Sequence, residues 1–191
     1  MEVSQIFGYL AGLTFAVSAG WYTYDVARKK VNVSLATFAI FSLLNLSQLA
    51  ALINEKAWTI VPFTVVGLVT SVLICFFSIK NHKLYFETPD KIGLIGALIG
   101  FVVWQLTNNA ALNIYILSLT NLIAFTPLIA KTFKHPDTET KKPWTLNLLA
   151  STFLILAINS TAPSVWVVPL RQFACSILMN IALHKKQTNY N

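Results

Sequence analysis

Residues 121–147, NLIAFTPLIAKTFKHPDTETKKPWTLN, decide the fold, because they end one apolar helix, form a short basic turn and begin another apolar helix. Residues 15–38, FAVSAGWYTYDVARKKVNVSLATF, have the same chemistry: an apolar run ends at the basic residues 28–30 and a second apolar run follows. The chain therefore contains the same helix–turn–helix pattern twice.

The repeat continues downstream of both segments. Trp58 and Pro62 open the next apolar run of the first half, and Trp166 and Pro169 open the corresponding run of the second half. A repeat displaced by roughly a hundred residues in so apolar a chain is typical of transporters built from duplicated membrane helices. We therefore expect two copies of one three-helix unit.

The amino-acid composition indicates whether the chain folds in water or in a membrane. Hydrophobic residues make up 55% of the 191 residues, charged residues make up 11%, and the mean hydropathy is +0.63. A bilayer core about 30 Å thick needs about 20 apolar residues of helix, and runs of that length follow one another along the chain. We predict a multi-pass integral membrane protein, without a cleaved signal peptide because only Glu2 is charged before the first run.

The apolar runs predict an all-α fold with seven transmembrane helices. The predicted helices span residues 6–24, 33–53, 58–79, 92–106, 111–133, 144–158 and 165–184. The first three form one bundle within residues 1–80, and the last three form a second bundle within residues 110–191, which includes a polar tail. A linker helix within residues 81–109 adds one crossing, so that both bundles have the same orientation (a 3+1+3 arrangement).

The distribution of positive charge predicts the topology. Of the 14 Lys and Arg residues, only Lys56 lies in a connection on one side, and Arg171 lies inside a helix. All the others lie on the opposite side: Arg28, Lys29, Lys30, Lys80, Lys83, Lys91, Lys131, Lys134, Lys141, Lys142, Lys185 and Lys186. The positive-inside rule then places the N-terminus outside and the C-terminus in the cytoplasm.

With these features the chain resembles the seven-helix SWEET sugar transporters and the wider PQ-loop (MtN3-like) family. The resemblance rests on the 3+1+3 design, the topology, Pro127 late in the fifth helix, the basic turn, and Pro143 followed by Trp144. The chain departs from the family in that Leu128, not glutamine, follows Pro127. The subfamily and the substrate therefore stay open.

The resemblance implies a facilitative transporter, a uniporter that carries a small neutral polar solute such as a sugar by alternating access. Such proteins bind solute between the bundles with a Trp and an Asn on the last helix of each unit, here Trp166 and Asn180. The third helix offers Trp58 but no Asn. The alternatives are a membrane receptor or scaffold of the same fold, and a transporter for a vitamin or an amino acid.

Amide side chains inside the apolar runs are the first candidates for binding solute. Asn45 and Gln48 lie about one turn apart in the second helix, and Asn147 and Ser151 form a similar pair in the sixth. Buried amides in hydrocarbon need partners or water, so the two pairs are expected to face one polar cavity. Asn121, midway along the fifth helix, is a further candidate. The alternative is that these residues only make interhelical hydrogen bonds.

Two of the tryptophans, Trp58 and Trp166, allow two interpretations. Trp58 and Trp166 lie at the outer ends of helices, where an aromatic belt alone would place them. Their repetition in both halves also suits stacking on a solute ring. Trp104 and Trp144 are expected to be interfacial.

Arg171 is a basic residue well inside a helix, where a charge is costly unless it pairs or snorkels. It either pairs with a partner such as Glu55, reaches the outer interface, or takes part in solute binding or an outer gate. Asp25 either pairs with Arg28 nearby or takes part in proton coupling.

Gly20, Pro127 and Pro169 are candidate hinge or gate positions, because glycine and proline weaken the helical hydrogen-bond ladder. The sequence contains no nucleophile elbow, HExxH motif or phosphate-binding glycine loop, so we expect neither an enzyme nor a cofactor. The basic residues form no patch for nucleic acid, and the histidines and cysteines are too dispersed for a metal site. The expected partners are the solute and the bilayer, and a homo-oligomer is compatible with the sequence.

Overall fold

The computed structural model describes residues 2–31, 33, 35–79 and 109–185, together with residues 95, 98, 99, 102, 103, 106 and 107; the side chains of residues 36 and 127 are excluded. This part of the chain contains six α-helices and one 3-10 helix. They are α1 (Val3–Ala27), α2 (Leu35–Asn54), α3 (Val61–Ile79), α5 (Ala110–Lys134), η1 (Pro136–Thr138), α6 (Lys141–Leu156) and α7 (Pro163–His184). The linker helix predicted over residues 92–106, including Trp104, falls largely outside the described residues.

The helices have the length and the surface of membrane helices. Five segments in the described part are long and apolar enough to span a bilayer: Val3–Ala27, Thr37–Asn54, Val61–Ile79, Ala110–Lys134 and Pro163–His184. Large apolar side chains such as Leu13, Val69 and Leu119 are exposed, whereas Gln48 and Asn147 are buried. An apolar outer surface with several polar side chains buried inside suits a lipid environment. The chain is a polytopic helical membrane protein.

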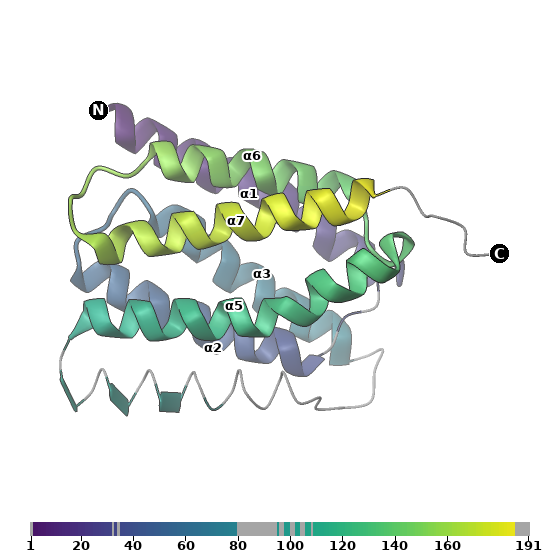
Figure 1. Cartoon of the computed structure of the whole chain (residues 1–191), viewed down its shortest axis with the longest axis horizontal. Helices are drawn as coiled ribbons and strands as arrows, with labels where there is room; N and C mark the ends of the chain where they lie inside the picture. Colours follow the sequence, from purple (N-terminus) through teal and green to yellow (C-terminus); the bar gives the residue numbers. More distant parts are fainter. Residues whose placement is uncertain are drawn as a thin grey trace.

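The six α-helices pack as a closed ring. Each one makes extensive contacts with two others, in the order α1, α3, α2, α5, α7, α6 and back to α1. Figure 1 shows their axes lying side by side, with the start of α1 and the end of α7 at opposite ends of the bundle. The α1–α2 and α5–α6 connections lie at one end, and the α2–α3 and α6–α7 connections lie at the other.

Three predicted helix starts were wrong by about one turn, and the first of these is α1, which begins at Val3 where we expected residue 6. We expected the third helix from Trp58, but α3 begins at Val61, because α2 ends in a turn that continues through residues 58–60. In that turn the amide of Ala57 donates to the carbonyl of Leu52, and Lys56 has a φ of 56°. This is the hydrogen-bond pattern of a Schellman motif.

The sixth helix begins at Lys141, three residues before its predicted start at Trp144. Pro143 therefore lies in the first turn of α6, where a missing backbone N–H costs little. This earlier start places Trp144 within the helix, not at its edge.

The first turns of α1 pack closely against the α2–α3 connection. A Cβ atom at Gly8 would clash with the carbonyl oxygen of Thr59, and one at Gly12 would lie 3.0 Å from Cβ of Pro62. Only glycine allows so close an approach of two backbones. At Gly20, by contrast, no neighbouring atom would lie within 4 Å of an added Cβ atom.

Two apolar clusters divide the interior along the helices. The first includes Ala11, Leu52, Phe63, Leu154 and Val168, and has members from all six α-helices. The second includes Tyr22, Ile74, Trp144 and Met179, and lies nearer the α5–α6 connection. The space between the two clusters holds the cavity described next.

Candidate functional site

A cavity of about 150 Å³ lies in the middle of the helix ring, and all six α-helices contribute to its wall. Phe63, in the first apolar cluster, and Trp144, in the second, both line it, so the cavity lies between the clusters. Five of the nine residues that the sequence suggested for solute binding line this cavity: Asn45, Gln48, Asn121, Asn147 and Arg171. Helices distant in the sequence thus bring most of the predicted polar residues to one volume.

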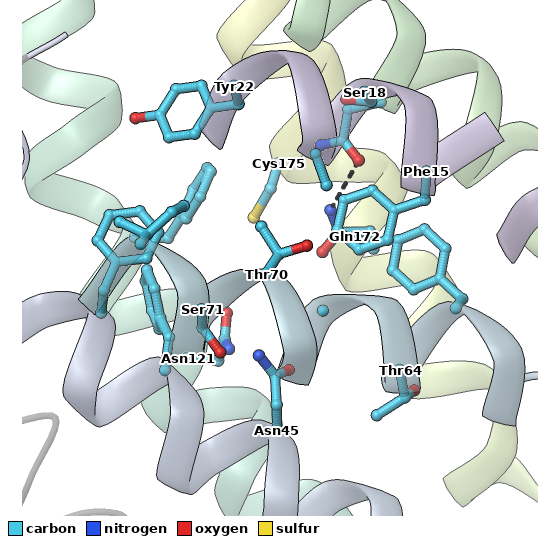
Figure 2. Close-up of a pocket in the computed structure, with 18 of the residues that line it drawn as sticks. Phe15, Ser18, Tyr22, Asn45, Thr64, Thr70, Ser71, Asn121, Gln172 and Cys175 are labelled. Atoms are coloured by element: carbon cyan, nitrogen blue, oxygen red, sulfur yellow. Dashed lines mark hydrogen bonds between the residues drawn. The ribbon is translucent and has the colours of Figure 1, made fainter. Parts of the chain in front are cut away.

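A chain of hydrogen bonds joins α6 to α7 along one wall. Gln172 Nε2 donates to Asn147 Oδ1 over 3.4 Å, and Asn147 Nδ2 donates to Ser176 Oγ over 3.2 Å. Ser176 Oγ in turn donates to the carbonyl oxygen of Gln172 over 2.8 Å. Figure 2 shows the Gln172 amide beside Thr70 and Cys175, with Asn45 approaching from the opposite side. This network holds the amide of Asn147 in place at the cavity wall.

Two further amides have unused hydrogen-bonding capacity. Asn45 and Asn121 line the cavity, and neither makes a hydrogen bond to any other described residue. A Cβ atom at Gly67 would lie 3.5 Å from the amide group of Asn45, so the glycine leaves room for that side chain. Unpaired amides in an apolar bundle require water or a ligand. These two residues are therefore the part of the wall best suited to contact a solute.

Arg171 is the only charged residue among those that line the cavity. Its Nη2 donates to Gln48 Oε1 over 3.4 Å, and its buried Nε has no hydrogen-bond partner among the described residues. The expected ion pair with Glu55 is absent: within the described chain, Glu55 Oε2 accepts a hydrogen bond from Ser164 instead. At the centre of a membrane helix an arginine costs about 2.5–3.5 kcal/mol on insertion scales.

Aromatic rings lie at both ends of the cavity. Phe15 and Phe63 stack with ring centroids 4.1 Å apart. At the other end, Tyr22 and Phe125 meet the Trp144 ring edge-on at 5.9 Å and 5.7 Å. Trp144 therefore faces neighbouring helices, and its interfacial depth stays a prediction. The indole is 9% exposed, because α1 and α5 cover it.

Four of the predicted binding residues do not line the cavity. Trp58 and Trp166 are 59% and 41% exposed, as expected for residues of an aromatic belt. Trp166 Nε1 donates to the carbonyl oxygen of Ser160. Ser151 is buried, and its hydroxyl donates to its own helix at Leu148. Asn180 joins α7 to α6 by donating to the carbonyl oxygen of Trp144 over 2.9 Å. These two side chains therefore make structural hydrogen bonds and do not line the cavity.

The cavity also contains residues that we did not predict. Gln172 meets the criterion that selected Asn45, a polar side chain inside an apolar run, and could have been chosen in the same way. The aromatic residues could not, because aromatic side chains in a membrane helix face lipid as readily as protein. The remaining unpredicted lining residues are Phe15, Ser18, Ala19, Tyr22, Phe38, Phe41, Phe63, Thr64, Gly67, Thr70, Ser71, Ile74, Phe125, Leu128, Pro143, Trp144 and Cys175.

The lining residues recur with the same spacing in the two halves. Phe15, Ala19 and Tyr22 of α1 have the spacing of Asn121, Phe125 and Leu128 of α5. Phe41 and Asn45 of α2 have that of Pro143 and Asn147 of α6, and Thr70, Ser71 and Ile74 of α3 have that of Arg171, Gln172 and Cys175 of α7. The wall of the cavity therefore repeats in geometry although its chemistry differs between the halves.

The candidate hinge residues occupy different environments. Pro169 is buried inside α7, and Pro127 lies inside α5, which changes direction in its C-terminal half (Figure 1). A proline inside a helix removes one ladder hydrogen bond and bends the helix. Gly20 lies on an exposed face of α1 with no neighbour to move against. Gly20 therefore has no close packing contact that would change in a hinge motion.

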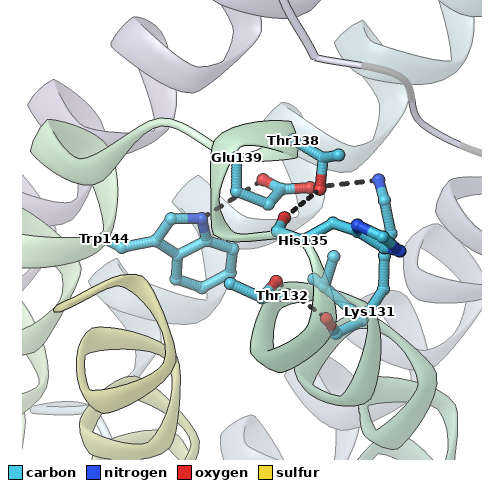
Figure 3. Close-up of polar contacts among 7 residues, drawn as sticks. Lys131, Thr132, His135, Thr138, Glu139 and Trp144 are labelled. Atoms are coloured by element: carbon cyan, nitrogen blue, oxygen red, sulfur yellow. Dashed lines mark hydrogen bonds and ion pairs between the residues drawn. The ribbon is translucent and has the colours of Figure 1, made fainter. Parts of the chain in front are cut away.

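A buried carboxylate lies next to the cavity, in the connection between η1 and α6. Glu139 is 6% exposed; it accepts a hydrogen bond from Trp144 Nε1 over 3.4 Å and pairs with Lys131 Nζ over 3.8 Å. Figure 3 shows its carboxylate between these two side chains. Burial raises the pKa of Glu139 from its ordinary value of 4.5, although Lys131, Trp144 and Tyr22 oppose the rise. The expected partner of Asp25, Arg28, is replaced by Lys30 at 3.6 Å.

Comparisons with protein-family models, with curated proteins and with solved structures found no match. Fold and cavity together define the class: a polytopic helical membrane protein with an internal cavity walled by amides, aromatic rings and one arginine.

Proposed function

We propose that the chain is a facilitative carrier that moves a small polar solute across the membrane by alternating access. The observation that carries the proposal is the central cavity, because all six described α-helices line it and the amides of Asn45 and Asn121 have no hydrogen-bond partner among the described residues. A cavity of about this volume accommodates a molecule the size of a single six-membered ring. The sugar implied by the resemblance belongs to the solutes to be tested.

The order of the helices supports two repeats moving against each other. Within the ring, α3 lies between α1 and α2, and α7 lies between α5 and α6, so the two triplets have the same internal order. Several lining residues also have the same spacing in the two halves, as expected of helices that face one cavity. A site at the junction of two repeats becomes accessible from alternate sides when one repeat rocks against the other. In this mechanism the two apolar clusters would separate in turn, each opening the cavity to one side of the membrane.

Uniport is favoured over proton coupling. In the described part of the chain no acidic side chain lines the cavity, and proton-coupled carriers use carboxylates or histidines at membrane depth. The receptor or scaffold alternative needs free basic side chains in the α5–α6 connection. Of the basic residues at the ends of α5 and α6 that flank it, Lys131 pairs with Glu139, and Lys142 Nζ lies 4.9 Å from the centroid of the Trp21 ring. Lys134 and Lys141 are exposed and make no ion pair within the described part of the chain. No contact in the structure favours that alternative.

The test is uptake of labelled sugars, amino acids, carboxylic acids and vitamins into proteoliposomes, with and without a pH gradient. We expect saturable uptake of at least one solute that a pH gradient does not drive. Replacing Asn121 with leucine should reduce uptake at least tenfold without unfolding the protein, because no protein hydrogen bond is lost.

The matched control is Trp166→Phe, which alters an exposed ring outside the cavity and should leave uptake unchanged. Absence of flux for every solute class would overturn the carrier proposal. Flux that Asn121→Leu leaves unchanged would show that this cavity is not the solute site.

A further inference from the structure

Arg171 gives the cavity a net charge that the wall does not compensate. Arg171 lies eight residues after the first residue of α7, which is about 12 Å along the helix and well below the membrane interface. Its protein contact is a 3.4 Å hydrogen bond to the neutral amide of Gln48. The two ion pairs within the described residues, Lys30 with Asp25 and Lys131 with Glu139, involve other side chains.

A buried charge of this kind is stable only with a counter-ion or water. The guanidinium is charged at all physiological pH values and presents N–H donors in a planar fork that matches a carboxylate. Arg171 Nε is buried without a hydrogen-bond partner among the described residues, so one donor of this guanidinium is unsatisfied. An anion that enters the cavity would supply the missing acceptors and the missing charge together.

The rest of the wall limits the size and the charge of that anion. The other lining side chains are neutral, and the amides of Asn45 and Asn121 are unpaired. One cation balances one negative charge, whereas a phosphate ester would leave part of its charge uncompensated. The stacked Phe15 and Phe63 rings, 4.1 Å apart, belong to the same wall and suit a flat or cyclic body.

We propose that the solute of this cavity is a small cyclic or aromatic monocarboxylate, whose carboxylate binds Arg171 and whose ring packs against the phenylalanine side chains. The proposal rests on the carrier function and replaces the neutral solute expected from the sequence with an anion. Asn45 and Asn121 would contact polar substituents on the ring. The pairing of Arg171 with a solute carboxylate also explains why an arginine lies at this depth in the membrane.

The test compares matched acids and neutral analogues on the purified full-length protein. Binding of benzoate and benzamide, and of glucuronate and glucose, is measured at pH 7.5 by calorimetry. We expect at least one acid to bind at least tenfold more tightly than its neutral partner. Inorganic phosphate, the control anion, should bind more weakly than that acid.

Two variants assign the effect to Arg171. Arg171→Gln should abolish the preference for the acid, and Arg171→Lys should retain part of it, because lysine keeps the charge but loses the fork. The melting temperature of the ligand-free Arg171→Gln protein should equal or exceed that of wild type, since a buried charge is removed. The comparison of acids with their neutral analogues on the wild-type protein needs no variant, so it remains valid even if Arg171→Gln fails to fold.

The outcomes separate the two proposals. Equal or tighter binding of glucose and benzamide than of their acids would overturn the carboxylate and leave the carrier intact. A preference for acids that persists in Arg171→Gln would overturn the role of Arg171. Tighter binding of phosphate than of either acid would replace the monocarboxylate with a phosphate-bearing solute. Failure of all these probes to bind, together with failure of the uptake screen, would remove both proposals.

Discussion

Glu139 is a buried carboxylate whose pKa is set by its surroundings. Its carboxylate faces Lys131 from α5, Trp144 from α6 and Tyr22 from α1, and its Oε1 has no hydrogen-bond partner. Loss of hydration outweighs these favourable contacts, so its pKa is raised. Glu139 also holds the Trp144 indole, which forms part of the cavity wall. A change of protonation at Glu139 therefore acts directly beside the candidate site.

This shift predicts how stability depends on pH. A carboxyl whose folded-state pKa is raised retains its proton in the fold at pH values where the unfolded chain has lost it. Its contribution is present below about pH 4.5, the unfolded value, and is lost as the pH rises through the folded pKa. We expect Glu139→Gln to remove this component and to raise the melting temperature relative to wild type at neutral pH.

The measurement is thermal unfolding in detergent between pH 4.5 and pH 8 for both proteins. Asp137→Asn is the control, because Asp137 lies only two residues away in η1 but is exposed. It should leave the pH profile of wild type unchanged. A profile for Glu139→Gln that is parallel to wild type across this range would contradict the prediction.

The packing of α1 shows how the surroundings of a helix decide the role of each of its glycines. Gly8 and Gly20 belong to the same helix and look equivalent in the sequence. Gly8 contacts the backbone of Thr59, whereas an added Cβ at Gly20 would meet no atom within 4 Å. The first glycine sets the distance between α1 and the α2–α3 connection. The second only weakens the helix.

The two positions therefore predict opposite effects of the same substitution. Gly8→Ala should destabilise the protein by about 1–3 kcal/mol, because the methyl group displaces backbone. Gly20→Ala should stabilise it by up to about 1 kcal/mol, the difference in helix propensity. Unfolding in detergent under identical conditions measures both values. Equal effects at the two sites would show that α1 does not pack as described.

On the scale of the molecule, the ring of six helices places most of the described basic residues at one end and few charged residues at the other. The α1–α2 connection and the adjoining ends of α5 and α6 carry most of the described basic residues, and the α2–α3 connection carries Lys56. The positive-inside rule predicts that the first end faces the cytoplasm.

Labelling of single cysteines tests this orientation. In a background with Cys75→Ser and Cys175→Ser, we expect Thr161→Cys in the α6–α7 connection to react with an impermeant maleimide on intact cells. His135→Cys, between α5 and η1, should react only after the membrane is opened. Both side chains are exposed, so access should depend on the side of the membrane alone. The reverse pattern would invert the topology.

The sequence alone determined that the chain is a membrane protein, where most of its helices lie, and which polar residues are unusual within them. Each of these follows from local properties: the length of apolar runs, turn chemistry, and the cost of a polar group in hydrocarbon. Asn45, Gln48, Asn121, Asn147 and Arg171 were found in this way, and all five line the cavity.

Only the tertiary structure decided which face of each helix lines the cavity. In a soluble protein the apolar face identifies the interior, but in a membrane protein lipid and core are equally apolar, so periodicity carries little information. Asn147 and Ser151 lie one turn apart on α6, yet only Asn147 reaches the cavity. Trp144 is buried because α1 and α5 cover it, and within the described chain Arg171 has no acidic partner and Glu55 contacts Ser164. These outcomes depend on the rotation and neighbours of each helix, which are set by packing between segments far apart in the chain.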